Sequence, residues 1–304
     1  MEPVFDTHAH LISADQSRYP PSPMHGPLRP VDISAPFDAD QLIASMDAAN
    51  VAFSCAVQRG HIYGYNNAYI LDSARRFPGR ITPVLMVAAF DPATPALLRD
   101  LAGQYPLGGI RLAAARITDY DTSWFNSPAA LKTWEVAAEL GLPVAIIFFV
   151  RHMSYNLPAL KLIAELFPQT PIVIDHVGVP HGSNYEVKWT RDQKLPAPYL
   201  GAPDFGIRPE LLALRACRNV YYKLTGINFE RFADDQVDPA AFVRRFVDEF
   251  GADHLMWGSD IGQTQGPYER LVDDARKAMA LLNPIERKRV LSDTAKRVYG
   301  AVGS

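Results

Sequence analysis

The segment Val4-Phe5-Asp6-Thr7-His8-Ala9-His10 places two imidazoles two residues apart, directly after an apolar start. Residues two apart on a β-strand share a face, so the spacing predicts that His8 and His10 point the same way. Such a pair can bind a divalent metal ion or donate two hydrogen bonds to a substrate oxygen. A short polar strand at a sheet edge would have the same spacing, so the interpretation of this pair depends on the rest of the chain.

The composition is that of a globular protein with a large core, since 48% of the 304 residues are hydrophobic and 21% are charged. Barrels of the α/β class commonly use about 250 residues as one domain, and no linker interrupts the chain, so we treat 1–304 as a single domain. The net charge of -3 and the scattered basic residues argue against nucleic acid as a partner.

The sequence also argues against export and against a membrane partner. No apolar run reaches the roughly 18 residues that a membrane span needs, and no basic segment precedes the first strand. Cys55 and Cys217 lie far apart inside apolar segments, which is typical of small buried side chains rather than of a disulfide framework. We therefore expect a cytoplasmic protein.

Short apolar strands alternate with helical segments along the chain. The first expected strand ends at His8 and His10, and the others span 51–57, 81–87, 109–112, 143–149, 171–177, 220–225 and 254–257. The expected helices begin near Asp38 and otherwise lie near 69–77, 95–104, 127–140, 157–167, 239–250, 267–282 and 284–299. The runs 143–149 and 171–177 are continuously apolar, as in parallel strands covered on both faces. Eight strand-helix units favour a closed (β/α)₈ TIM barrel of the α/β class over an open doubly wound sheet.

Two connections are longer than the others. Residues 11–37 follow the first strand and contain many prolines, which forbid regular helix, so we expect a covering loop there. Residues 178–208 follow the sixth strand and carry aromatic and basic side chains, which is typical of a lid over an active site.

Active sites in this architecture lie at the C-terminal ends of the strands. His8 and His10 end the first strand, His176 ends the sixth, and Asp260 follows the eighth, whereas His254 precedes its strand and is discounted. Closure of a barrel brings the first and last strands together, so Asp260 is expected beside the imidazoles as a metal ligand, a general base for water, or both in turn. Taken alone, His176 could be a core histidine and Asp260 a helix cap, but all four at one end favour catalysis.

Basic residues gather at the same end of the predicted barrel. The candidates for binding an acidic group of a substrate are Arg59, Arg111, Arg116, Arg151 and His152. Arginine forks bind carboxylate or sulfonate in a bidentate manner, although each arginine could instead only solvate a loop. Lys223 lies inside an apolar strand, where an unpaired ammonium is costly, so it either pairs with a carboxylate or faces the site. We favour the second option and include Lys223 among the catalytic residues.

Three motifs together resemble the amidohydrolase superfamily: Asp-Thr-His-Ala-His at 6–10, Ile-Asp-His-Val-Gly at 174–178 and Trp-Gly-Ser-Asp at 257–260. Within it, Gly-Ile-Arg at 109–111 and Lys-Leu-Thr-Gly at 223–226 resemble the lactonase branch that includes 2-pyrone-4,6-dicarboxylate lactonase. The resemblance implies a TIM barrel, hydrolysis of a lactone, and a reaction that can proceed without bound metal.

The metal requirement is the point on which the sequence departs from metal-binding members of that superfamily. The run Ile-Ile-Phe-Phe at 146–149 offers neither the bridging lysine nor the histidine that such members place on the fourth or fifth strand. Positive charge from the arginines and Lys223 would also repel a divalent cation. We therefore expect that no cofactor is required. The alternative is one divalent metal, zinc or manganese, bound by His8, His10, His176 and Asp260.

The expected activity is that of a hydrolase that opens the lactone ring of a small catabolic intermediate carrying a carboxylate or sulfonate. Asp260 would take a proton from water, while His8, His10 and His176, with Lys223, would stabilise the developing oxyanion. One alternative is a metal-dependent decarboxylase or hydratase acting on an unsaturated or aromatic acid. Another is a non-catalytic barrel that binds a small acid. The partner is a small anionic substrate in each case, and the oligomeric state is open, with a homodimer among the options.

Overall fold

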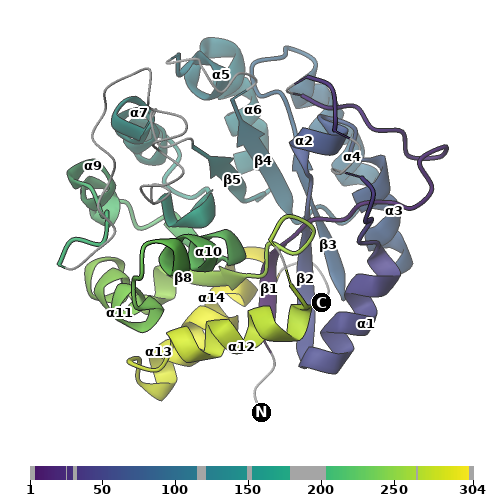
Figure 1. The fold of residues 1–304 in the computed structure, drawn as a ribbon. Helices are drawn as coiled ribbons and strands as arrows, with labels where there is room; N and C mark the ends of the chain where they lie inside the picture. The colour runs from purple at the N-terminus through teal and green to yellow at the C-terminus, as the bar shows by residue number, and fades with distance from the viewer. Residues whose placement is uncertain are drawn as a thin grey trace.

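The computed structural model describes residues 4–24, 26–29, 33–114, 121–148, 153–178, 203–264 and 266–300. Its strands form one eight-stranded parallel sheet in the order β1 to β8, surrounded by helices (Figure 1). The strands are β1 (Val4–Ala9), β2 (Val51–Val57), β3 (Ile81–Met86), β4 (Gly109–Ala113), β5 (Val144–Ile147), β6 (Ile172–Ile174), β7 (Val220–Thr225) and β8 (Leu255–Gly258).

The first and last strands meet and close the sheet. The backbone N–H of Asp260 donates to the carbonyl of His8 at 2.6 Å, and that of His10 donates to the carbonyl of Ile261 at 2.9 Å. Further down, the hydroxyl of Thr7 donates to the carbonyl of Trp257 at 2.7 Å. The predicted single-domain (β/α)₈ barrel is therefore confirmed.

The helices between the strands follow the predicted alternation. They are α1 (Ala39–Ala49), α2 (Gly60–Tyr63), α3 (Ala68–Arg76), α4 (Thr94–Gln104), α5 (Ser123–Asn126), α6 (Pro128–Glu139), α7 (Met153–Leu166), α9 (Pro209–Leu212), α10 (Gly226–Asp234), α11 (Pro239–Phe250), α12 (Tyr268–Ala278), α13 (Pro284–Lys288) and α14 (Thr294–Tyr299). Helix α1 begins with a capping box, in which Asp38 and Gln41 each bond the other's backbone N–H. No helix among the described residues is both long and apolar enough to span a membrane.

Two layers of apolar side chains make up the core. The larger one lies between the strands and the helices and includes Leu42, Trp134 and Phe246. The smaller one contains alternate residues of β2, Phe53 and Cys55 among them, together with Tyr299 of α14. Because alternate residues of a barrel strand point inward, this second cluster fills the barrel interior. Because the interior is packed with side chains, an active site can form only at an end of the barrel.

The observed elements differ from the predicted ones in several places. Strand β6 stops at Ile174, because the next residues form the short helix η3 (Asp175–Gly178), where His176 and Val177 have φ of 56° and 52°. Helix α7 begins at Met153 rather than near 157, and the expected helix 284–299 is divided by a π-helical turn, η6 (Arg289–Asp293). Helices α2, α5, α9 and α10 were not predicted.

The described part of the first long connection follows β1 and packs against the neighbouring helices. There, Ile12 and Tyr19 pack against Ile62 and Tyr63 of α2, so the described part of 11–37 is bound to the helices after β2. Most of the expected lid, residues 179–202, lies outside the described residues.

Candidate active site

His10 is oriented by the end of the neighbouring strand. Its Nδ1 lies 2.7 Å from the backbone carbonyl of Val57 at the end of β2. A carbonyl can only accept a hydrogen bond, so Nδ1 carries the proton and Nε2 of the neutral ring has a lone pair; this tautomer is assigned from the contact. That Nε2 lies 3.3 Å from Oδ1 of Asp260. Burial lowers the pKa of His10, which keeps the ring neutral.

His8 is fully buried between two carboxylates. Its Nδ1 lies 3.4 Å from Oδ1 of Asp175, and its Nε2 lies 3.6 Å from Oδ1 of Asp260. Neither ring nitrogen makes a hydrogen bond to any residue that the structure describes. Burial lowers the pKa of His8 well below its usual value, so the ring has a single proton to share between these two carboxylates.

Asp260 follows β8 with a left-handed backbone, at φ 56°. Its Oδ2 accepts a hydrogen bond from the hydroxyl of Thr264 at 3.2 Å, while Oδ1 has no hydrogen-bond partner within the described ranges. Burial opposes its ionisation, but the neighbouring imidazoles outweigh burial and lower the pKa of Asp260. A non-glycine residue in this strained conformation is typical of functional sites.

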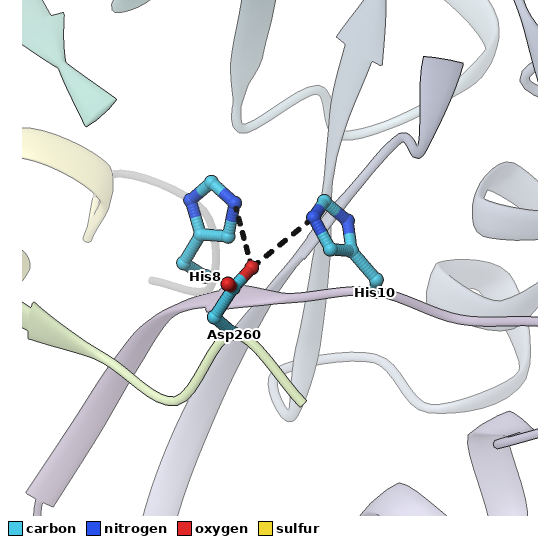
Figure 2. A group of neighbouring side chains, drawn as sticks. All are labelled: His8, His10 and Asp260. Atoms are coloured by element: carbon cyan, nitrogen blue, oxygen red, sulfur yellow. Dashed lines mark ion pairs between the residues drawn. The ribbon is translucent and has the colours of Figure 1, made fainter. Parts of the chain in front are cut away.

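These three side chains fit a divalent metal ion. Their ligand atoms, one from each residue, lie within 4.8 Å of one another, and Figure 2 shows both rings directed at the carboxylate. An imidazole nitrogen that carries no proton and an ionised carboxylate both offer lone pairs, which a cation between them can bind. Histidine nitrogen and aspartate oxygen are ligands for zinc and manganese. The other nitrogen of each ring faces an oxygen that orients it, as in known metal sites.

His176 lies beside this group without belonging to the three. Its ring centroid is 5.2 Å from that of His8, and its Nδ1 lies 2.6 Å from Oγ1 of Thr225 at the end of β7. Its carbonyl accepts a hydrogen bond from the side chain of Asn228 in α10 at 3.0 Å. Strand β7 and helix α10 therefore hold His176 in its left-handed conformation. Burial lowers its pKa and favours a neutral ring.

Asp175 was not among the predicted catalytic residues, yet it contacts three polar side chains of the site. Its Oδ2 accepts from Nε of Arg111 at 2.8 Å, and its Oδ1 lies 3.5 Å from Nζ of Lys223 as well as near His8. Lys223 is fully buried and pairs with the carboxylate of Asp175, the first of the two options considered for it, while its catalytic role stays a prediction. The sequence signal for Asp175 was its place beside His176 at the end of a strand.

Asp6 was also not predicted. Its fully buried carboxylate accepts hydrogen bonds from the backbone N–H of His8 at 3.0 Å and from the backbone N–H and hydroxyl of Ser259. It therefore ties the strand that carries the histidines to the segment that carries Asp260. Asp6 and Ser259 lie within the motifs 6–10 and 257–260, next to the predicted site residues.

Two of the five predicted acid-binding residues, Arg111 and Arg59, lie within the described residues, and both bond to other parts of the chain. Nε of Arg111 is bound to Asp175, and its Nη1 donates to the carbonyl of Gln58 at 3.3 Å. Arg59 donates from Nη1 to the carbonyl of Gly262 at 2.6 Å, and from Nη2 to the side chain of Gln263, which links the loops after β2 and β8. Arg116, Arg151 and His152 lie outside the described residues. The acid-binding role of this set stays a prediction.

Comparisons with known proteins identify relatives of two kinds. An L-fucono-1,5-lactonase from Burkholderia ambifaria is 28% identical over 193 residues, which cover 63% of this chain and 59% of the relative. A probable 2-pyrone-4,6-dicarboxylic acid hydrolase from Acinetobacter baumannii, solved with citric acid bound, superposes with a TM-score of 0.68 at 22% identity, over 98% of this chain and 100% of that one. These relatives support the lactonase branch that the motifs predicted.

The second kind is a metal-containing decarboxylase. The structure of a 5-carboxyvanillate decarboxylase from Novosphingobium aromaticivorans contains manganese and 4-hydroxy-3-methoxy-5-nitrobenzoic acid. It superposes with a TM-score of 0.65 at 13% identity, over 98% of this chain and 96% of that one. Manganese therefore occurs in a protein that shares this fold.

Our expectation that no metal is required is wrong. His8, His10 and Asp260 form a group that fits a metal ion, and a protein of the same fold contains manganese. We had taken the missing lysine or histidine on the fourth or fifth strand as evidence against a metal, but three ligands from the first and eighth strands suffice for a mononuclear site. The positive charge that we expected to repel the ion is also partly neutralised, because Asp175 pairs with both Arg111 and Lys223.

The motifs at 6–10, 174–178 and 257–260 thus converge on one site at the C-terminal end of the barrel. The family model described as Amidohydrolase matches residues 5–301, almost the whole chain. The chain belongs to the amidohydrolase family.

Proposed function

We propose that this protein is a hydrolase that opens the ring of a small lactone carrying an acidic group, with Asp260 as the general base. The observation that carries the proposal is the contact of Asp260 Oδ1 with both His8 and His10, at 3.6 and 3.3 Å, at the C-terminal end of the barrel. The amidohydrolase family and its relatives named as lactonases support an enzyme that acts on cyclic esters.

Asp260 is suited to remove a proton from water. Its lowered pKa keeps the carboxylate ionised at neutral pH, and Thr264 holds Oδ2 by a hydrogen bond. His8, His10 and Asp260 would hold a divalent ion, which supplies polarisation of the ester carbonyl and a lowered pKa for water. Side chains of the protein carry out the proton transfer and stabilise the oxyanion.

His176 is suited to stabilise the oxyanion that develops on the carbonyl. The hydroxyl of Thr225 has two acceptors to choose between, Nδ1 of His176 at 2.6 Å and Oδ1 of Asn228 at 3.3 Å, and the shorter contact favours donation to Nδ1. In that tautomer Nε2 carries the proton and can donate to a developing negative charge. Because Asn228 also holds the carbonyl of His176, the ring is fixed before the substrate arrives.

The charge balance favours an anionic substrate. Two buried cations, Arg111 and Lys223, stand against three buried carboxylates, Asp6, Asp175 and Asp260. A divalent ion then makes the site positive, which attracts an acidic substrate and stabilises its oxyanion. Nη2 of Arg111 has no partner among the described residues, and the acid-binding role that we propose for Arg111 rests on it. The citric acid in the Acinetobacter baumannii relative is consistent with such a pocket.

A panel of lactones tests the proposal. The protein, loaded with zinc or manganese, would be offered five- and six-membered lactones with and without a carboxylate or sulfonate, and acid release would be followed by titration at constant pH. We expect hydrolysis with a preference for the acidic members, and about 100- to 10,000-fold slower release by Asp260→Asn. Hydrolysis of none of them would overturn the lactonase proposal, and equal rates for neutral and acidic members would overturn the acidic substrate class.

A metal-dependent decarboxylase of an aromatic or unsaturated acid is the second candidate, because a decarboxylase of the same fold contains manganese. Release of carbon dioxide from such acids, without lactone hydrolysis, would favour it. A ligand that binds and is returned unchanged would favour a non-catalytic barrel. We also propose a cytoplasmic location, which the two free cysteines support, since both are buried.

A further inference from the structure

A buried ionic cluster contacts His8 through Asp175, a residue to which the proposed reaction gives no role. Asp175 at the end of β6 contacts Arg111 of β4 at 2.8 Å and Lys223 of β7 at 3.5 Å. Arg111 is only 5% exposed, and the other two are buried more deeply. Groups buried in this way are costly unless they are paired, so a role for the cluster is expected.

The two histidines of the first strand are oriented in different ways. His10 donates from Nδ1 to a neutral backbone carbonyl, that of Val57. The Nδ1 of His8 faces the carboxylate of Asp175 at 3.4 Å, and no other acceptor among the described residues hydrogen-bonds to it. Of the two carboxylates that His8 contacts, Asp175 is the nearer, and it favours the tautomer with the proton on Nδ1.

The carboxylate of Asp175 stays charged because of its neighbours. Its Oδ2 accepts from Nε of Arg111 at 2.8 Å and its Oδ1 lies 3.5 Å from Nζ of Lys223, and two cations at these distances favour the ionised carboxylate. An ionised carboxylate can only accept, so it fixes the proton of His8 on Nδ1 and leaves the lone pair of Nε2 for a metal ion.

We propose that Asp175 is a positioning residue for the metal site: it fixes His8 in the Nδ1–H tautomer so that Nε2 can bind the ion. Arg111 and Lys223 hold the Asp175 carboxylate in place and act on the site through it. The inference deepens the proposed function and rests on its metal site, but it does not depend on the identity of the substrate.

Metal affinity tests this role without any measurement of activity. Competition of zinc between the protein and a chromophoric chelator would be measured for the wild type and for Asp175→Asn, His8→Ala and His10→Ala, and then for Asp175→Asn combined with each histidine variant. We expect Asp175→Asn to weaken zinc binding about 10- to 100-fold, the usual effect of removing a residue that orients a metal-binding histidine.

The combined variants separate positioning from a general loss of structure. If Asp175 acts through His8, its replacement causes no further loss in the His8→Ala protein but keeps its full effect in the His10→Ala protein. Equal losses in both backgrounds would overturn the proposal. Thermal unfolding of the metal-free proteins would identify variants that fail to fold.

A measurement on the unaltered chain keeps the proposal testable if Asp175→Asn does not fold. The ¹⁵N chemical shifts of the His8 ring in the metal-free protein distinguish a protonated Nδ1 from a protonated Nε2. We expect Nδ1–H, and a protonated Nε2 would overturn the role of Asp175. Failure of the lactone panel leaves both measurements unaffected, so the two proposals can fail separately.

Discussion

Asp6 on β1 and Ser259 after β8 are joined by two hydrogen bonds, from the Ser259 backbone N–H to Oδ1 at 2.8 Å and from its hydroxyl to Oδ2 at 2.6 Å. The Ser259 hydroxyl also accepts from the backbone N–H of Ile261 at 3.1 Å. The turn that carries Asp260 is therefore bound on both sides, which holds its left-handed backbone in place. On its other side, Asp6 accepts from the hydroxyl of Tyr268 at 3.0 Å.

Replacement of Ser259 by alanine should lower kcat, because the turn at Asp260 loses its side-chain hydrogen bonds. Tyr268→Phe is the matched control, since it removes one hydrogen bond from the same carboxylate without touching the turn. We expect each variant to lower the free energy of unfolding by about 1 to 3 kcal/mol. Only Ser259→Ala should reduce kcat; equal kcat values in the two variants would mean that the turn does not depend on Ser259.

Asp260→Asn should reduce turnover about 100- to 10,000-fold, the usual contribution of a positioned general base. Asparagine keeps the shape of the side chain but removes the base and weakens the ligand oxygen. Steady-state rates with saturating metal would measure the loss, and circular dichroism would check the fold. Substantial residual turnover would remove Asp260 from the proposed mechanism.

Dialysis against a strong chelator should abolish activity, and addition of zinc or manganese should restore it. Because the ion binds only the folded chain, its removal should also lower the midpoint of thermal unfolding. The expected stabilisation is about 2.7 kcal/mol at a free-ion concentration of 100 times Kd. Full activity in protein shown by elemental analysis to be free of metal would contradict the assignment of His8, His10 and Asp260 as ligands.

The stability of the protein should fall as the pH drops below about 6.5, and His254 offers a test away from the active site. Burial lowers the pKa of His254 from its usual 6.5, although the Val220 carbonyl, 2.7 Å from Nδ1, acts in the opposite direction. The unfolded chain then takes up the proton first, so stability is present above pH 6.5 and is lost towards the folded pKa.

Denaturant unfolding of the wild type and His254→Gln between pH 7.5 and 5 would measure this effect. The variant should lose less stability, by at most about 1.4 kcal/mol per pH unit, because one group no longer takes up a proton. Parallel stability curves for the two proteins would show that His254 has its usual pKa in the folded state.

The elements predicted best are those whose limits are determined by local chemistry. Helix α11 was predicted at its observed limits, Pro239–Phe250, since Asp238 caps its start and Gly251 follows its end. Strands β2 and β7 were also predicted at their limits. Strand β6 was predicted too long, because an apolar run does not reveal that His176 and Val177 turn to positive φ.

Active sites of barrels lie at the C-terminal ends of the strands, and this rule predicted that His8, His10 and Asp260 lie together. The structure brings these side chains into contact. The rule could not predict the pairing of Arg111 with Asp175, which depends on side chains that cross the barrel interior between β4 and β6. For the same reason, the count of positive charges led to a wrong expectation about metal binding. Charge along a sequence does not show which cations are already neutralised in the fold.

The backbone contacts that close the barrel, between His8 and Asp260 and between His10 and Ile261, also bring together the three residues proposed to bind the metal ion. Any partly folded chain in which β8 has not joined β1 therefore lacks the site. His8 and His10 are synthesised long before Asp260. During synthesis on the ribosome, the ion can therefore bind all three residues only after Asp260 has emerged and β8 has docked against β1. Binding of the ion thus indicates that the barrel has closed, and a chain whose synthesis stops before Asp260 binds no ion at this site.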